Sequence, residues 1–184
     1  MVLTESQKLE LGTIAPDFTL TDTLSGKELS LWSIRGKEGT VVMFICNHCP
    51  FVVYINNLII ELAAQYGQKW VTFVAISSND AISHPYDGPE NMAKHAKEVG
   101  YNFPYLYDES QEIAKKYKAV CTPDMFFFGK NLELVYHGQL DSARPGSEIP
   151  LSGIDIRKAI DTYMRSGEIV ELQKPSIGCS IKWK

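Results

Sequence analysis

Two cysteines three positions apart, Cys46 and Cys49, are the side chains of this chain best suited to chemistry. Thiols at this spacing can close a small disulfide ring and reopen it on reduction. A helix that starts at the first cysteine would stabilise its thiolate through its free amide groups and lower the thiol pKa. We therefore expect Cys46 to be the exposed attacking thiol and Cys49 the resolving thiol. His48, between them, would favour the Cys46 thiolate further and make the couple more oxidising than one with Gly–Pro between the cysteines.

The same two cysteines could instead form half of a zinc site. The remaining ligands could come from four other residues, namely Cys121, Cys179, His48 and His137. Zinc knuckles usually combine two such cysteine pairs in polar, glycine-rich loops, whereas this pair follows an apolar segment and precedes an amphipathic one. The redox interpretation, with no bound metal or cofactor, is therefore favoured, and the zinc site is kept as an alternative.

The segments on either side of the pair predict how it is positioned. Residues 40–45 are almost entirely apolar and β-prone, which indicates a central strand buried on both faces. Pro50 suits the first turn of a helix, and apolar residues then recur at helical spacing until Gly67. Residues 70–77 predict a second buried strand. The pair therefore lies at the first junction of a strand–helix–strand unit.

The rest of the chain predicts the outer elements of an α/β sheet of mixed direction. Residues 16–31 alternate around a Ser–Gly turn, as in a short β-hairpin. The other predicted elements are a helix over 89–99, a helix from a capping box at Asp108 and Gln111 to about Tyr117, strands over 125–128 and 132–136, and a helix over 152–165. The tail, residues 168–184, is too irregular to assign.

Length, charge and cysteine content narrow the class of protein. The 184 residues fit a single domain, residues 1–184, that can bury a full core. A net charge of −4 without basic runs argues against nucleic acid and anionic membranes as partners, and no stretch reaches the ~18 apolar residues of a membrane span. Four cysteines are too few for a disulfide-framed secreted module, and the polar residues 1–9 contain no signal-peptide core. We therefore expect a cytoplasmic protein.

These motifs together resemble the thioredoxin superfamily. The strand–CNHC–helix unit is followed later in the chain by Thr122–Pro123 before a hairpin, an order similar to that of thioredoxins. Residues 16–20 (PDFTL) and 106–128 resemble one branch of the superfamily, the redoxins of the alkyl hydroperoxide reductase and thiol-specific antioxidant (AhpC/TSA) family. The resemblance covers about residues 8–165. It implies a thioredoxin-like fold, a central mixed β-sheet flanked by helices, with the N-terminal hairpin as an extension. It also implies a cis Pro123 beside the cysteines, and a substrate groove in which Thr122 and Pro123 offer backbone groups to an extended peptide.

Some positions depart from the family patterns. Thioredoxins usually have Trp before the first cysteine and a buried Asp on the preceding strand, where this chain has Ile45 and Thr40. Peroxiredoxins carry Pro-x-x-x-Thr/Ser-x-x-Cys, and Pro50 matches the proline that commonly follows if Cys49 is the peroxidatic cysteine. Cys46 then replaces the hydroxyl residue that orients a peroxide. The chain thus resembles a peroxiredoxin-like protein with a thioredoxin-style cysteine pair.

We predict a thiol–disulfide oxidoreductase that uses the Cys46–Cys49 couple on protein disulfides or small thiols. The first alternative is a thiol peroxidase, an antioxidant enzyme that reduces hydroperoxides, for which Arg144 is a candidate site residue. The second is a non-catalytic zinc-binding module. Cys121, close to Pro123, could be a third redox cysteine or a small buried residue. Cys179 could be a mobile tail thiol that resolves a sulfenic acid or a mixed disulfide, or an inert thiol.

Overall fold

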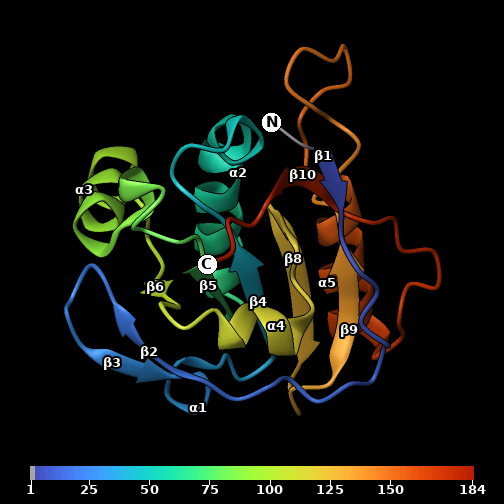
Figure 1. Ribbon diagram of the computed structural model, residues 1–184. Coiled ribbons are helices and arrows are strands. Elements are labelled where there is room, and N and C mark those ends of the chain that lie inside the picture. The colour runs from blue at the N-terminus through green and yellow to red at the C-terminus, as the bar shows by residue number, and fades with distance from the viewer. Residues whose placement is uncertain (1–2) are drawn as a thin grey trace.

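A computed structural model describes residues 3–184 and centres on a seven-stranded sheet in the order β3-β2-β6-β5-β4-β8-β9 (Figure 1). β4, β5 and β6 run parallel to one another, and the remaining pairs are antiparallel, so the sheet is mixed as predicted. The strands are β2 (Thr19–Asp22), β3 (Glu28–Ser30), β4 (Gly39–Phe44), β5 (Val71–Ser77), β6 (Tyr105–Tyr107), β8 (Asp124–Gly129) and β9 (Leu134–Gly138).

Helices cover both faces of this sheet. The helices are α1 (Leu31–Ile34), α2 (Pro50–Gly67), α3 (Pro89–Val99), α4 (Glu112–Tyr117) and α5 (Ile154–Ser166), with a short 3-10 helix η1 (Pro85–Asp87). Because successive strand residues point to opposite faces, Val41 and Met43 of β4 pack in one core with α2, α3 and α5, while Val42 and Phe44 pack in a second core with α4. Each face of the sheet is therefore buried, and the predicted thioredoxin-like α/β architecture is confirmed.

The centre of the sheet positions the cysteine pair. All six residues of β4 are buried between β5 and β8, as the apolar run predicted. The chain leaves β4 at Phe44, passes through the CNHC motif and enters α2 with Pro50 at its first position. Proline costs nothing there because the first-turn amides of a helix have no intrahelical partner. The two cysteines therefore lie just beyond the end of a fully buried strand.

A second, three-stranded sheet lies beside the first and corrects the prediction for the tail. Its order is β1 (Leu3–Glu5), β10 (Ile177–Ser180) and β7 (Cys121–Thr122), all antiparallel. Figure 1 shows β10 running between the N-terminal strand and the centre of the molecule. The tail was expected to lie outside the core without assignable structure. The prediction failed because four residues form this strand only by pairing with β1 and β7, which are distant in sequence.

Glycine is needed at one position of this small sheet. A Cβ on Gly178 of β10 would overlap the Thr122 carbonyl oxygen. β10 can therefore approach β7 only with a glycine at this point.

The helix α4 differs from its prediction at one end. It begins at Glu112 after Gln111, which has a left-handed backbone conformation, and no capping box forms. The Asp108 carboxylate instead accepts hydrogen bonds from the Ala114 amide and the Ser78 hydroxyl. Among residues 3–184, no helix combines the length and apolar character required to cross a membrane.

Candidate active site

Both cysteines of the motif are buried, at the junction of β4 and α2. Cys46 is 2 % exposed and Cys49 is fully buried. The Cys46 sulfur lies 3.5 Å from the Thr122 hydroxyl oxygen, so the segment before Pro123 covers it. The prediction that Cys46 would be exposed is therefore wrong. The sequence could not show that Thr122, far along the chain, would close over this sulfur.

The helix N-terminus lies at the second cysteine rather than the first. Cys49 is the N-cap of α2, and its carbonyl accepts hydrogen bonds from the Val52 and Val53 amides. A helix terminus acts within about one turn, so its amide groups serve Cys49. The expectation that this helix would acidify Cys46 is wrong for that reason.

The two thiols share a proton in a way that favours a thiolate at Cys49. A hydrogen bond from the Cys46 thiol lowers the pKa of Cys49 to about 5 against the opposing effect of burial, and hydrogen bonds from Cys179 and the Val52 amide add to it. Donating that bond raises the pKa of Cys46, as do its burial and the nearby Asp87 carboxylate. The direction of the two pKa shifts favours the negative charge on Cys49 and the proton on Cys46.

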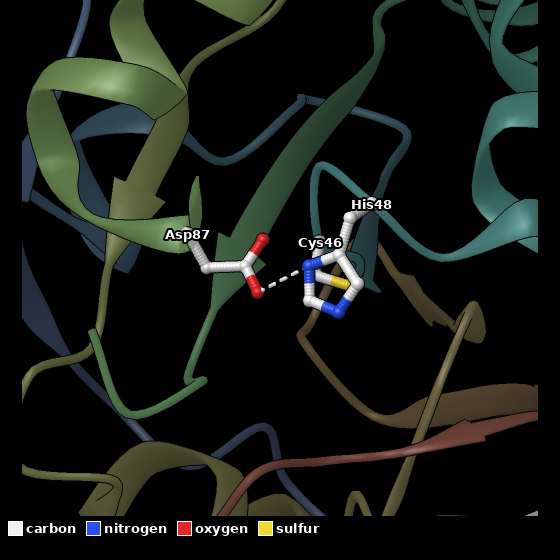
Figure 2. A group of neighbouring side chains, drawn as sticks. All are labelled: Cys46, His48 and Asp87. Atoms are coloured by element: carbon white, nitrogen blue, oxygen red, sulfur yellow. Dashed lines mark ion pairs between the residues drawn. The ribbon is translucent and has the colours of Figure 1, made fainter. Parts of the chain in front are cut away.

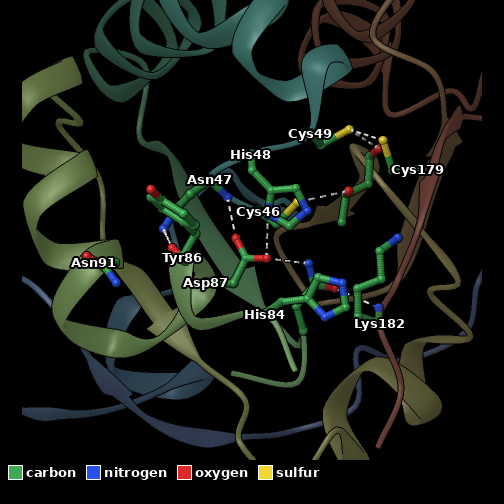
Figure 3. Close-up of polar contacts among 12 residues, drawn as sticks. Cys46, Asn47, His48, Cys49, His84, Tyr86, Asp87, Asn91, Cys179 and Lys182 are labelled. Carbon is green, nitrogen blue, oxygen red and sulfur yellow. Dashed lines mark hydrogen bonds and ion pairs between the residues drawn. The ribbon is translucent and has the colours of Figure 1, made fainter. Parts of the chain in front are cut away.

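His48 is held by a residue that the sequence did not single out. Its Nδ1 lies 2.8 Å from an Asp87 carboxylate oxygen, and Figures 2 and 3 draw this contact as a dashed line. Asp87 is fully buried in η1 and also accepts hydrogen bonds from the Asn47 amide, at 2.9 Å, and from the Asn79 side chain, at 2.8 Å. In the sequence, the polar loop over residues 83–89 carries no spacing that marks Asp87 as part of the site. The loop follows β5, the parallel neighbour of β4, and the carboxyl ends of parallel strands lie at the same edge of a sheet. This placement was the feature of the sequence that could have indicated Asp87 as a site residue.

The His48 side is the part of the site nearest to solvent. The His48 side chain is 39 % exposed and stacks on His84, with ring centroids 5.9 Å apart. Tyr86 is largely exposed beside them, and its carbonyl accepts a hydrogen bond from the Asn47 side chain. A surface hollow next to the motif is lined by Asn47, His48, Tyr86, Asn91, Lys94, His95 and Glu98. A partner molecule can therefore approach the motif over His48.

The described residues bring one set of metal-binding groups together. Ligand atoms of Cys46, His48 and Asp87 lie within 4.8 Å of one another (Figure 2). This is not the predicted zinc set, since His137 pairs with Asp124 at 3.1 Å instead. Structural zinc sites normally close with four ligands, and Asp87 already accepts bonds on both of its carboxylate oxygens. The arrangement suits an oriented histidine beside a thiol better than a closed zinc site.

Thr122 and Pro123 lie where the resemblance placed them, beside the cysteines. The Thr122–Pro123 bond is cis, and the Thr122 carbonyl oxygen lies 3.2 Å from the Cys49 sulfur. The backbone of Thr122, however, pairs with Cys179 of β10. The open groove implied for an extended peptide is therefore occupied at this point by the chain's own C-terminal strand.

The two further cysteines have different surroundings. The Cys179 sulfur lies 2.8 Å from the Cys49 sulfur, and Figure 3 shows the two atoms facing each other. Cys179 is only 5 % exposed, so the expectation of a mobile tail thiol is wrong. Cys121 is fully buried, and burial raises the pKa of its thiol. Within residues 3–184, no hydrogen bond reaches the Cys121 sulfur, which behaves as a small core side chain.

Comparisons with known proteins agree with this architecture. Residues 11–137 match the AhpC/TSA family. The thiol-disulfide oxidoreductase ResA of Geobacillus kaustophilus (strain HTA426) is 31 % identical over 134 residues, which cover 71 % of this chain and 70 % of ResA.

Solved structures extend the comparison. An uncharacterized conserved protein from Geobacillus kaustophilus is 52 % identical with a TM-score of 0.98, covering 100 % of this chain and 97 % of that one. The thioredoxin domain of a thiol-disulfide oxidoreductase from Bacteroides vulgatus is 18 % identical with a TM-score of 0.66, covering 85 % and 99 %, and shows that the fold is thioredoxin-like. Because the family match spans more than half of the residues, this chain belongs to the AhpC/TSA family.

Proposed function

We propose that Cys46 and Cys49 are the dithiol/disulfide couple of this thiol–disulfide oxidoreductase, and that it acts on protein disulfides or small-molecule thiols. The observation that carries the proposal is the position of both thiols at the junction of β4 and α2, beside the cis Thr122–Pro123 bond, and the lowered pKa of Cys49 agrees with it. A stabilised thiolate in the reduced state makes a couple more oxidising, because reduction then releases more free energy. The relatives named as thiol-disulfide oxidoreductases support the same activity.

Cys46 makes the first contact with the partner disulfide. Cys49 is enclosed by Thr122 and Cys179, whereas the buried Cys46 has a ligand atom within 4.8 Å of one on His48, whose side chain is 39 % exposed. As the Cys46 sulfur bonds to one partner sulfur, its proton passes to the Cys49 thiolate and the other partner sulfur leaves as a thiolate. The shared proton thus activates Cys46 at the moment of attack, although its resting pKa is raised.

Cys49 completes the exchange. Its sulfur attacks the Cys46 sulfur of the mixed disulfide, and its proton goes to the second partner sulfur as that sulfur leaves. The products are a Cys46–Cys49 disulfide and a partner reduced by two electrons. Asp87 contributes by orienting His48 at the entrance and by keeping the proton on Cys46 before the partner arrives.

Turnover of an insulin disulfide in the presence of dithiothreitol tests the proposal. We expect Cys46→Ser and Cys49→Ser to lose the activity, and Cys49→Ser to accumulate a mixed disulfide through Cys46. Cys121→Ser is the matched control, since it also replaces a buried sulfur, for which the described residues provide no hydrogen-bonded sulfur, and it should retain the activity. Turnover at the wild-type rate by Cys46→Ser would overturn the proposal.

A thiol peroxidase is the second candidate, favoured by the acidic Cys49 at the N-terminus of α2. The residues expected to bind a peroxide do not support a peroxidase function. Cys46 occupies the hydroxyl position, and the Arg144 guanidinium is bound within its own loop by the carbonyls of Asp141 and Ala143. Rapid mixing with hydrogen peroxide separates the two functions. Thiol loss no faster than for free cysteine would exclude the peroxidase.

A further inference from the structure

The C-terminal strand reaches the active site by backbone pairing. In β10, Cys179 is the register partner of Thr122 on β7 and of Leu3 on β1. The strand is therefore held on both edges, and Gly178 allows it to approach the Thr122 carbonyl closely. This pairing fixes Cys179 at the site without any covalent link.

The side chain of Cys179 meets the buried cysteine of the motif. The 2.8 Å separation of the Cys49 and Cys179 sulfurs is shorter than the 3.5 Å from Cys46 to the Thr122 hydroxyl on the other side of the site. Both sulfurs are buried, so no solvent lies between them. Cys49 thus has a sulfur neighbour on either side, Cys46 within its own motif and Cys179 across the second sheet.

We infer that Cys179 is a third redox-active thiol, and that the active-site disulfide passes from Cys46–Cys49 to Cys49–Cys179. This inference rests on the proposed function, because that function supplies the Cys46–Cys49 disulfide. β10 then acts as a built-in strand substrate, which occupies the peptide-binding edge at Thr122 and presents a cysteine to the motif.

The transfer is a disulfide exchange that needs no outside oxidant. The Cys179 sulfur, as a thiolate, attacks the Cys49 sulfur. The Cys49–Cys179 bond forms, the Cys46–Cys49 bond breaks, and Cys46 leaves as a thiolate that takes up the proton released from Cys179. The chain stays oxidised by two electrons throughout. Its outcome is a free Cys46 thiol beside His48 and a covalent link between α2 and β10.

The reduced and oxidised states differ in how readily Cys179 can attack. In the reduced site, burial is the main cause that raises the pKa of Cys179 to about 12, and a hydrogen bond to Cys49 and the Cys49 charge add to it. The last two contributions require an anionic Cys49, so they vanish once Cys49 is part of a disulfide. The nearby Lys182 acts in the opposite direction and favours the Cys179 thiolate. Oxidation of the motif therefore prepares Cys179 to react.

Disulfide mapping of the full chain tests this inference. The reduced protein is oxidised with diamide, quenched in acid at increasing times, alkylated and digested with trypsin. Cleavage after Lys69 and Arg165 places Cys179 on a different peptide from the motif, so a Cys49–Cys179 link joins two peptides and a Cys46–Cys49 link joins none. In the wild type we expect the Cys46–Cys49 link to appear first and to decline as the inter-peptide link rises, with the number of free thiols constant.

Three variants make the result decisive. Cys46→Ser leaves the tail untouched and should form only the inter-peptide link. Cys179→Ser should form only Cys46–Cys49, and Cys121→Ser should behave as the wild type. If wild type and Cys46→Ser never form the inter-peptide link while Cys179→Ser forms Cys46–Cys49, the relay is refuted and the proposed function stands. If Cys179→Ser also fails to form Cys46–Cys49, the proposed function fails as well.

Discussion

The shared proton of the motif predicts a thiolate whose pKa depends on the neighbouring thiol. The pKa of Cys49 falls from its usual 9.0 to about 5, which corresponds to roughly 5 kcal/mol in favour of the anion. The hydrogen bond from Cys46 is the largest cause. A hydrogen bond to a charged group contributes about 1.5–3 kcal/mol, or about 1–2 pKa units. Cys46→Ala should therefore raise the pKa of Cys49 back towards its usual value, by an amount equivalent to about 1.5–3 kcal/mol.

Thiolate absorbance in the ultraviolet, followed against pH on the fully reduced chain, measures this shift without requiring a reagent to reach the buried sulfur. The pKa of Cys179 is raised to about 12 and burial also raises that of Cys121, so neither contributes near neutral pH. We expect one thiolate per wild-type chain with a midpoint near pH 5. Cys46→Ser is the matched control, because its hydroxyl can still donate a hydrogen bond and should keep the midpoint closer to the wild type.

Two outcomes would refute the shared-proton account. One is a wild-type chain that shows no thiolate until the pH approaches the ordinary cysteine range. The other is a Cys46→Ala chain that titrates as the wild type does, since the Cys49 thiolate would then be stabilised without Cys46.

Three further predictions concern stability and positioning. The folded pKa of Cys49 lies below its unfolded value, so the unfolding free energy of the reduced protein should rise with pH between about 5 and 9, by up to about 1.4 kcal/mol per pH unit, and this gain is lost as pH falls through about 5. Urea unfolding of the reduced and the oxidised protein at several pH values measures this. Equal slopes of unfolding free energy against pH for the two forms would contradict the prediction. Gly178→Ala should destabilise the protein by about 1–3 kcal/mol, because the added methyl group overlaps the Thr122 carbonyl and pushes β10 away from β7. The same displacement should expose Cys179 and speed its alkylation. An unchanged alkylation rate would show that β10 tolerates the methyl group. Asp87→Asn should cost about 1–3 kcal/mol by disrupting the buried bonds to Asn47 and His48. An unfolding free energy in urea equal to that of the wild type would show that these bonds add nothing to stability.

Local sequence patterns were enough for the elements that carry the motif. The apolar run of β4, the helical spacing after Pro50 and the hairpin of β2 and β3 are each set by residues close together in the chain, and each was predicted. The mixed direction of the sheet followed from their order. α4 was less well predicted, because Asp108 uses its carboxylate on Ala114 and Ser78 rather than on a capping box.

The chemistry of the site required contacts that no local pattern encodes. Asp87 lies 40 positions from the Asn47 amide that it binds, and Cys179 lies 130 positions from Cys49. Both contacts depend on how distant parts of the fold come together. The sequence of a short strand such as β10 does not predict the strands with which it pairs.

The sequence by itself determined that two cysteines would meet at a strand–helix junction, beside a cis proline, in a thioredoxin-like sheet. Tertiary structure alone decided which sulfur carries the charge, which carboxylate orients His48 and which distant thiol faces Cys49. The physical reason is one of range. Secondary structure follows from the periodicity of neighbouring side chains, whereas a pKa and a sulfur–sulfur contact follow from the charges, amide groups and strands that folding brings in from elsewhere in the chain.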